Sequence, residues 1–303
     1  MDLALISFNQ ILTLSVLMMI GVFCAKLKMI NEETNKQLSN LLLMVVNPLL
    51  IFLSYQRPFE QKLLDGLLLM MLLSTISFVI NLVVAHLIYR NQAKDDYAIE
   101  KFGLIYTNAG FLGIPLINGV FGSEGVFYLT GYLTIFFIFF WTHGFIIMSG
   151  KKDFSAIKKA LVSPPMIGIL LGFIFFVLRI ELPQVIYTPL RTLGNINTPL
   201  AMLVAGVSIS GTNFAKLFKN KKIYAVCGFR LLLLPALTII ALVAFSIPTV
   251  ILGTLIILAA CPVATNIILF AYRYNRDNIY ATEIFVATTI LSMFTIPLLL
   301  LLL

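Results

Sequence analysis

Apolar residues in this chain gather in long continuous runs that short polar loops separate. A helix needs about 20 mainly apolar residues to cross the hydrocarbon core of a membrane. Runs of that length predict ten spans: Leu5–Lys26, Leu38–Tyr55, Leu64–Tyr89, Phe102–Phe121, Val126–Met148, Leu161–Leu178, Val185–Ser208, Ile223–Phe245, Thr249–Tyr272 and Ile279–Leu301. The pattern therefore predicts an all-α polytopic membrane protein, with residues 1–303 forming one membrane domain.

Composition supports this class. Of 303 residues, 60% are hydrophobic and 11% are charged, whereas a soluble protein is about 45–50% apolar and about 25% charged. The three cysteines, Cys24, Cys227 and Cys261, lie in apolar runs and no CxxC motif occurs. We interpret them as small apolar core residues, and we expect neither a metal site nor a disulfide framework.

The positions of Lys and Arg predict the orientation in the membrane. Sixteen of the 21 fall in or next to the odd-numbered loops, four fall in or near the even-numbered loops, and Arg230 alone lies deep within a span. Because cytoplasmic loops carry the excess of Lys and Arg, the odd-numbered loops should be cytoplasmic and both termini should face outside a cell membrane. The net charge of +8 reflects this asymmetry. Since the basic residues are dispersed at helix ends, we expect membrane lipid as a partner and no nucleic acid.

The two halves of the chain, about residues 1–150 and 151–303, resemble each other weakly at an offset of about half the 303-residue length. Each half holds five spans. Because five is odd, the second half must enter the membrane inverted, and inverted repeats are the architecture of many secondary transporters. The matching positions are Gly21 with Gly172, Lys28 with Arg179, Asn47–Leu50 with Thr198–Ala201, and the turn Gly122–Gly125 with Asn275–Asn278.

Residues that weaken a helix interrupt the fourth and ninth spans. Proline removes a backbone donor, glycine costs about 1 kcal/mol relative to Ala in a helix interior, and unpaired backbone groups cannot face lipid. The sequence therefore predicts two broken helices whose free N-terminal ends offer partial positive charge to an anion; ordinary packing kinks are the alternative. The residues are Asn108, Gly110, Gly113 and Pro115 in the fourth span, and Pro262 and Asn266 in the ninth.

The second and seventh spans carry matched interruptions, Asn47-Pro48 and Asn197-Thr198-Pro199. Proline disfavours the α conformation of the residue before it. We predict kinks that flank the central site. Whether Asn47 contacts a ligand directly or the kinks serve packing alone stays open at this point.

These segments together resemble the auxin efflux carrier family, which includes bacterial malate and malonate permeases. The most specific stretch is "CPVATNIILFAYRYNRDNIYATEIFVATTILSMFTIPLLL", Cys261–Leu300, and "TNAGFLGIPL" resembles its fourth-span counterpart. The resemblance implies ten spans in two inverted five-helix repeats, with broken helices 4 and 9 crossing at the substrate site, and it maps Asn108, Pro115, Pro262 and Asn266 to that crossover. The long fifth loop of many plant members is missing here, which favours a bacterial organic-acid carrier over a carrier of auxin itself.

Arg230 lies about 12 Å into the eighth span, counted from its inner end. A charge in a span normally faces a partner or a wet cavity. Three hypotheses follow: an ion pair with Glu283 near the start of the tenth span, bidentate binding of a substrate carboxylate, or snorkelling to the inner interface.

Other polar residues in the spans have simpler interpretations. His86 and His143 sit near predicted cytoplasmic ends and are interpreted as interfacial hydrogen-bonding groups, with proton coupling as the alternative. Trp141, Tyr128, Tyr132 and Tyr187 are interpreted as interface anchors. No cofactor is expected. Coupling to Na⁺, to H⁺ or to neither stays open, although backbone carbonyls at helix breaks could bind Na⁺.

Three classes of function compete. We predict a carrier that moves a small organic anion, a mono- or dicarboxylate such as malate, by alternating access. An exporter of another amphipathic metabolite and an anion channel are the alternatives; a channel would need a continuous polar lining. An enzyme is not expected, because the sequence has no HExxH motif and no paired carboxylates in the spans. For assembly, a homodimer is left open.

Overall fold

The computed structural model describes residues 3–90, 97–150, 162–211, 217, 220–242 and 244–301. These residues are almost entirely helical, and the extended pairing among them is a single antiparallel bridge between Thr107 and Val263. Seven of the sixteen basic residues assigned to odd-numbered loops lie outside the described residues: Lys94, Lys151, Lys152, Lys158, Lys159, Lys216 and Lys219.

The helices follow the predicted spans in order. Several spans contain a wider π-helical turn, labelled η, that joins two α-helical segments without a loop. The elements are α1 (Leu3–Lys26), α2 (Glu32–Leu41), η1 (Leu42–Val46), α3 (Asn47–Ser54), α4 (Gln61–Ile88), α5 (Ala98–Ile105), η3 (Ala109–Gly113), α6 (Ile114–Phe139), η4 (Phe140–Gly144), α7 (Phe145–Ser149), α9 (Pro164–Val177), α10 (Gln184–Asn195), α11 (Asn197–Ser210), α13 (Lys221–Gly228), η5 (Phe229–Leu233), α14 (Leu234–Leu242), α15 (Thr249–Ala260), α16 (Asn266–Arg273) and α17 (Asn278–Leu300).

Seven helical stretches are long and apolar enough to cross a membrane. One of them, Ala109–Ser149, covers two predicted spans, the end of the fourth and all of the fifth. It turns at Gly122, whose φ of +60° is open to glycine at no steric cost. Two shorter apolar helices, α9 and α15, cover the sixth span and the first part of the ninth. The prediction of an all-helical, polytopic membrane protein is confirmed.

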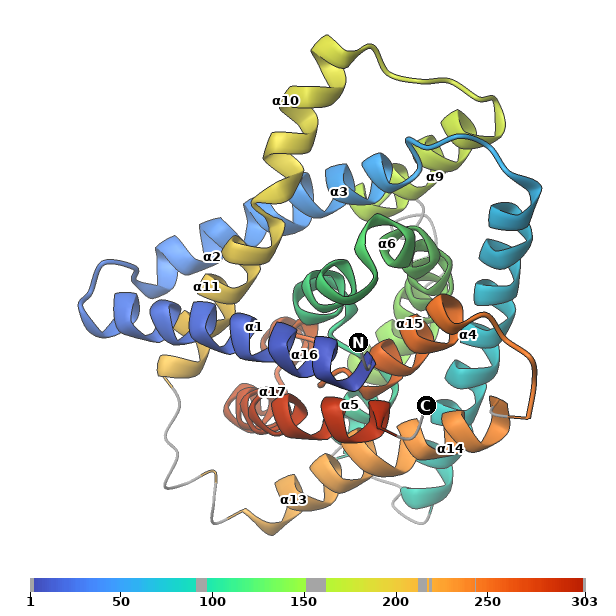
Figure 1. Cartoon of the computed structure of the whole chain (residues 1–303). Coiled ribbons are helices and arrows are strands. Elements are labelled where there is room, and N and C mark those ends of the chain that lie inside the picture. The colour runs from blue at the N-terminus through green and yellow to red at the C-terminus, as the bar shows by residue number, and fades with distance from the viewer. Residues whose placement is uncertain are drawn as a thin grey trace.

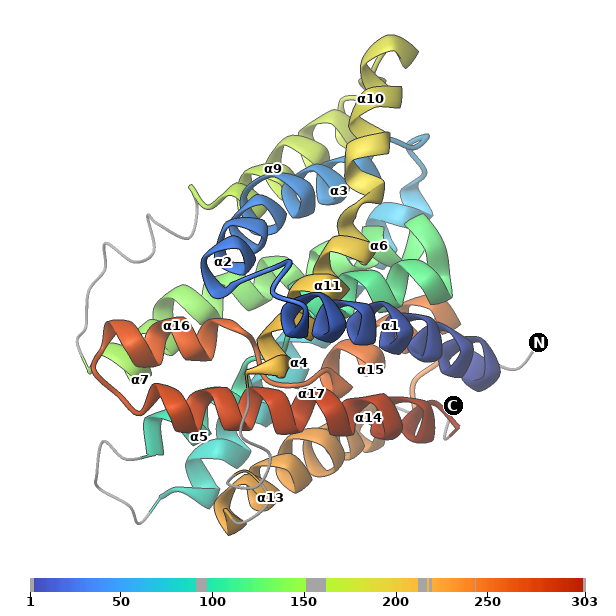
Figure 2. The ribbon, with the colours of Figure 1, turned by 90° about the vertical axis from the view of Figure 1, so that its left-hand side faces the viewer.

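The helices form two groups (Figure 1). The framework group comprises α1, α2, α3, α9, α10 and α11, and the crossing group comprises α4 to α7 and α13 to α17. In Figures 1 and 2, α9 and α10 lie at the top and α13 lies at the bottom. Helices α1 and α3 pack against α6, and α1 also packs against α17, so these contacts join the groups.

Within the framework group, two helix pairs pack reciprocally. Helix α1 runs along α11, and α9 runs along α3. At the first contact the α-carbon of Gly21 lies 3.0 Å from the point where a Cβ on Gly206 would be. At the second, a Cβ on Gly172 would overlap the ring of Tyr55. Small residues permit this close approach of helix backbones, as is common between helices in membranes.

Gly206→Ala is expected to destabilise the protein by about 1–3 kcal/mol, because inserted atoms in a packed interface force backbone shifts. The new Cβ would overlap the carbonyl oxygen of Met18, which belongs to backbone and cannot rotate away. Thermal unfolding in detergent measures the effect. Gly228→Ala, in α13, is the matched control: a Cβ there meets nothing within 4 Å, so this variant should be neutral or slightly more stable. Equal unfolding temperatures for Gly206→Ala and the parent protein would contradict the packing argument.

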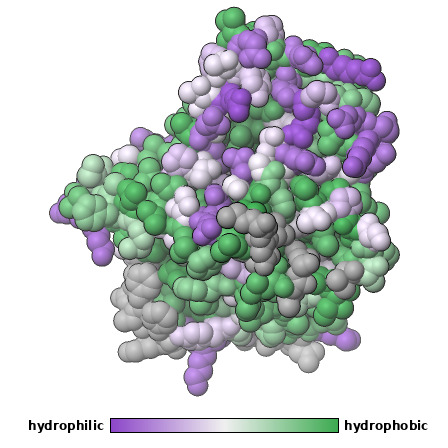
Figure 3. Space-filling model, in the orientation of Figure 1, coloured by the Kyte–Doolittle hydropathy of each residue, from purple (hydrophilic) through white to green (hydrophobic). Residues whose placement is uncertain are grey.

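The outer surface suits a lipid environment. Large apolar side chains stand outward on several helices, including Val16 on α1 (61% exposed), Val185 on α10 (85%) and Phe294 on α17 (72%). Apolar residues cover much of the face seen in Figure 3, with polar residues gathered toward its top. Apolar areas this extensive are rare on soluble monomers. The start of α1 and the end of α17 lie on one side of the molecule, and the turn between α16 and α17 lies on the opposite side (Figure 2).

Candidate functional site

Two broken helices meet inside the crossing group. Helix α5 ends at Ile105, and the helical chain resumes with η3 at Ala109. Helix α15 ends at Ala260, and α16 begins at Asn266. The sequence therefore identified the two broken spans, the fourth and the ninth, and located the break of the ninth at its centre.

The extended residues between the half-helices pair with each other. The backbone amide of Asn108 donates to the carbonyl of Pro262 at 2.8 Å, and the amide of Ala264 donates to the carbonyl of Tyr106 at 2.9 Å. The amide of Val263 donates to the hydroxyl of Thr288 on α17 at 3.2 Å. Each break thus supplies partners for the other, which is how non-helical backbone can persist at membrane depth.

The residues that break the fourth span differ from those expected. We predicted that Pro115, Gly110 and Gly113 would open the backbone, yet the extended residues precede all three. Pro115 is the second residue of α6, which continues η3 without a loop, so its missing amide hydrogen leaves a carbonyl of η3 without an intrahelical donor but does not end the helix. A Cβ on Gly113 would lie 2.9 Å from the Leu258 side chain, so its small size serves close packing against α15. In the ninth span, Pro262 does lie within the break.

A cavity of about 240 Å³ lies beside the crossing, between the two helix groups. Its lining comes from α2, η1, α3 and the start of α9 on the framework side, and from both breaks, α6, η4 and α16 on the crossing side. Of the predicted site residues, Asn47, Asn108, Gly110 and Asn266 line this cavity. Gly113, Pro115, Pro262 and Arg230 do not line it.

Four asparagines line the cavity, and three of them are predicted site residues. The Asn108 side-chain oxygen accepts from the amide of Phe111 at 3.3 Å and so caps the new helical segment. The Asn47 amide nitrogen donates to the carbonyl of Gly110 at 3.4 Å. Asn266 is half-buried in the first turn of α16, and its side chain makes no hydrogen bond within the described part of the chain.

The two matched asparagine–proline motifs meet in the structure. The amide nitrogen of Asn197, at the start of α11, donates a short hydrogen bond to the side-chain oxygen of Asn47. Both side chains are buried. The π-helical turn η1 leads directly into Asn47, and α10 ends two residues before Asn197. The α-helices are thus interrupted just before both predicted motifs, where the two amides meet.

The rest of the cavity wall is apolar and aromatic. The aromatic lining residues are Phe111, Phe136, Phe137, Phe140, Trp141 and Phe270. No charged side chain occurs among the described lining residues. Two buried polar atoms on this wall, Nε1 of Trp141 and Oγ1 of Thr265, have no hydrogen-bond partner among the described residues.

The sequence did not predict that Trp141 lines the cavity. It and Tyr132 were interpreted as interface anchors, but Trp141 lines the cavity and the buried Tyr132 hydroxyl hydrogen-bonds to Oγ1 of Thr107 at 2.9 Å. Trp and Tyr have the same hydropathy at a membrane interface and inside the protein, so no local signal in the sequence separates an interface anchor from a buried or cavity-lining residue.

Arg230 is fully buried on the other side of the crossing. Its guanidinium donates to the carbonyls of Cys261, Leu104 and Ala259. Full burial excludes snorkelling in this conformation. Within the described part of the chain it forms no ion pair, so the predicted Arg230–Glu283 pair is absent from this structure.

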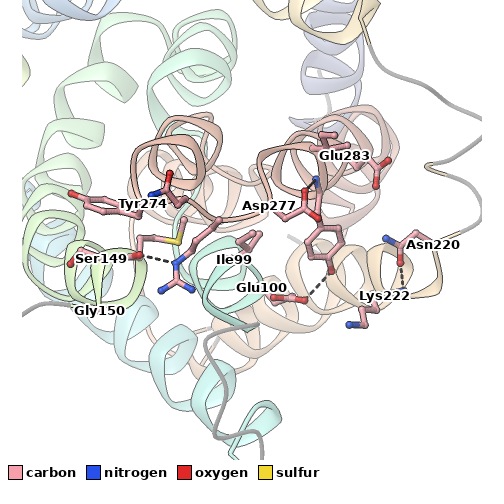
Figure 4. A pocket seen from close by; sticks show the side chains of 14 residues that line it. Ile99, Glu100, Ser149, Gly150, Asn220, Lys222, Tyr274, Asp277 and Glu283 are labelled. Atoms are coloured by element: carbon pink, nitrogen blue, oxygen red, sulfur yellow. Dashed lines mark hydrogen bonds between the residues drawn. The ribbon is translucent and has the colours of Figure 1, made fainter.

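Glu283 instead lines a second, polar cavity of about 900 Å³. Figure 4 shows it with Glu100, Asp277 and Lys222, where the starts of α5, α13 and α17 come together. The Tyr280 hydroxyl donates to the Glu100 carboxylate at 3.1 Å. This cavity has carboxylates and basic groups mixed in its lining, which gives no single preference for the charge of a ligand.

The two histidines lie together, close to the crossing. The rings of His86 and His143 have centroids 5.4 Å apart. Nδ1 of His143 lies 3.0 Å from the Tyr106 hydroxyl, which donates to the carbonyl of Phe139 at 2.9 Å. His143 is therefore linked directly to a residue of the broken fourth span.

Comparison with known proteins identifies the family. A family model described as membrane transport protein matches residues 6–158 and 151–300. The chain belongs to this family. It is the auxin efflux carrier family that the two broken spans resemble, and membership confirms a multi-pass membrane transporter.

Two archaeal relatives extend over the whole chain. An uncharacterized transporter of Methanothermobacter thermautotrophicus is 27% identical over 299 residues, which cover 96% of this chain and 97% of that protein. An uncharacterized transporter of Methanocaldococcus jannaschii is 25% identical over 303 residues, covering 94% of this chain and 95% of that protein. Both alignments therefore include the two halves of the chain.

Proposed function

We propose that this transporter is a secondary carrier for a small organic anion, which binds in the cavity beside the crossing. One observation carries the proposal: the helical segment that starts at Ala109 and helix α16 both begin at the cavity. Helix N-termini carry partial positive charge and free amides. Together they form a binding place for a carboxylate that needs no Lys or Arg.

The cavity wall supports a narrower substrate class. One carboxylate can bind at the two helix ends and the amides of Asn108 and Asn266. The apolar surface of Phe136, Phe140 and Phe270 then faces the remainder of the substrate. A second carboxylate, as in malate, would face this apolar wall without a cation, and an uncompensated buried charge is costly. We therefore place a monocarboxylate with an apolar body ahead of malate, and an amphipathic metabolite of this kind also suits an exporter.

The location between the helix groups supports alternating access. The cavity has one wall on each group, so movement of the crossing group against the framework group would change the side from which the carboxylate is reached. Reciprocal packing of α1 on α11 and of α9 on α3 is what two inverted five-helix repeats would produce. With the odd-numbered loops cytoplasmic, Asn40 and Ser163 of the lining lie near cytoplasmic helix ends, and this conformation faces inward with both termini outside.

Uptake and counterflow in proteoliposomes test the proposal. The panel comprises malate, malonate, lactate, amino acids, and the aromatic monocarboxylates benzoate and phenylacetate, each with and without Na⁺ and a pH gradient. We expect saturable uptake that is fastest for the aromatic monocarboxylates, and acceleration when the same compound is loaded inside. Flux that neither saturates nor shows counterflow would support an anion channel instead. Transport of a cation without any carboxylate flux would contradict the proposed substrate class.

A further inference from the structure

Arg230 occupies an unusual place for a basic side chain within a membrane span. It lies in the π-helical turn η5 of the eighth span and is 0% exposed. Its Nε and Nη2 both donate to the carbonyl of Cys261, at 3.1 and 2.9 Å. Its Nη1 donates to Leu104 at 3.1 Å, and Nη2 also donates to Ala259 at 2.9 Å.

These acceptors share one property: they belong to the C-terminal ends of the two broken helices. Leu104 is in the last turn of α5, and Ala259 and Cys261 end α15. The last carbonyls of a helix have no intrahelical partner, and each helix C-terminus carries about half a negative charge. Two such ends provide about one negative charge, which matches the guanidinium without any carboxylate.

The same kind of position holds the coupling cation in other carriers. Half-helix C-termini and unwound carbonyls are where secondary transporters coordinate Na⁺. Here the two C-terminal ends face Arg230, while the N-terminal ends of the following helical segments face the cavity. The crossing is therefore polarised, with a fixed cation on one side and a cavity for an anion on the other.

We propose that Arg230 is a tethered cation that replaces a free alkali ion at the crossing of the two broken spans. Because the guanidinium already satisfies these carbonyls, neither assembly of the crossing nor transport needs Na⁺ at this position. Arg230 is a positioning residue, since it acts on the substrate through the helix ends that it joins. The part of the proposal that concerns transport rests on the proposed function, whereas the part that concerns the cation does not.

Chemical rescue of purified Arg230→Ala tests the proposal without a substrate. We expect its unfolding temperature in detergent to fall by about 10 °C, since removal of a fully buried, multiply bonded group is strongly destabilising. Guanidinium at about 10 mM, far below denaturing concentrations, should restore at least about half of that loss by binding the vacated carbonyls. The unfolding temperature of Arg230→Lys should lie between those of the parent protein and Arg230→Ala, because one ammonium cannot reproduce the planar set of donors.

Arg276→Ala is the matched control. Arg276 also donates to helix-end carbonyls, to Met148 at 2.7 Å and Ile147 at 3.3 Å, but it is only half-buried beside the polar cavity. Its replacement should cause a smaller loss that guanidinium does not reverse, because water reaches that position.

The parent protein supplies the decisive second measurement. Its unfolding temperature, and its flux for any carboxylate that the panel identifies, should be the same in Na⁺, K⁺ and choline. Specific stabilisation or activation by Na⁺ would overturn the proposal, and so would Arg230→Ala with an unchanged unfolding temperature and no response to guanidinium. If Arg230→Ala does not fold, Arg230→Lys and the ion comparison still decide. A panel without carboxylate flux would leave the unfolding results intact and count against the proposed function alone.

Discussion

Asn266→Ala is expected to lower carboxylate flux by about 10- to 100-fold with normal abundance in the membrane. Asn266 lines the cavity at the start of α16, and its side chain makes no hydrogen bond within the described part of the chain. Its replacement should therefore leave the fold nearly unaffected. A hydrogen bond to a charged group contributes about 1.5–3 kcal/mol, which corresponds to this range of rates. Initial rates in proteoliposomes, normalised to the reconstituted protein, measure the effect.

Asn108 needs a more careful comparison, because its side chain also caps η3. Asn108→Ser keeps a capping oxygen but loses the amide, so a flux deficit in this variant reports on the ligand and not on the cap. Asn31→Ala is the matched control, since Asn31 caps α2 through the amide of Thr34, at 2.8 Å, away from the cavity. Normal kinetics in both Asn266→Ala and Asn108→Ser would remove the crossing from the transport mechanism.

Asn47→Leu and Asn197→Leu are each expected to destabilise the protein by about 1–3 kcal/mol. Each variant leaves the partner amide buried without its hydrogen bond, and an orphaned polar group costs that much. The double variant removes both amides at once, so its loss should be smaller than the sum of the two single losses. Denaturation of the four proteins of this cycle in detergent measures the coupling.

Asn35→Ala serves as the comparison for this pair. The Asn35 amide donates to the Ser208 hydroxyl at 3.1 Å between α2 and α11, at the edge of the framework group. Its loss should be smaller, because the half-buried Ser208 hydroxyl keeps its own hydrogen bond to the carbonyl of Val204, at 2.9 Å. Strict additivity in the Asn47–Asn197 cycle would show that the two amides stabilise the protein independently, contrary to their contact.

The crossing combines two electrostatic arrangements in a small space. The C-terminal ends of α5 and α15 meet Arg230, and the N-terminal ends of the next helical segments meet the cavity. A break in a membrane helix exposes both kinds of end, and both must be satisfied within the protein. In this transporter Arg230 supplies a cation to one set of ends, and we propose that the other set receives an anionic ligand.

Several features of the site could be predicted from residue types alone. Proline and glycine alter the backbone locally, so "TNAGFLGIP" and "CPVATN" marked the two broken spans. The position of the first break within its segment was wrong, because the extended residues Tyr106–Asn108 precede Gly110 and Pro115. The backbone opens where the break of the ninth span can pair with it. The paired residue there, Val263, is more than 150 residues away from Thr107 in the sequence.

The partner of Arg230 could not be predicted. A backbone carbonyl has the same chemistry at every position, so nothing about Leu104, Ala259 or Cys261 marks them as acceptors. Glu283, the residue with an obvious charge, lies in a different cavity. Residue type indicates which charge needs compensation, and it does not indicate that helix ends supply it.

By itself the sequence determined the membrane class, the order of the spans, the two broken helices and the resemblance that family membership confirms. These depend on hydropathy, span length and backbone chemistry, which act over a few neighbouring residues. Only the tertiary structure decided which half-helix ends face Arg230, that Asn47 meets Asn197, and that Trp141 joins the cavity wall. Those contacts connect segments that are distant in the chain, and their energies depend on distances that exist only after the helices pack.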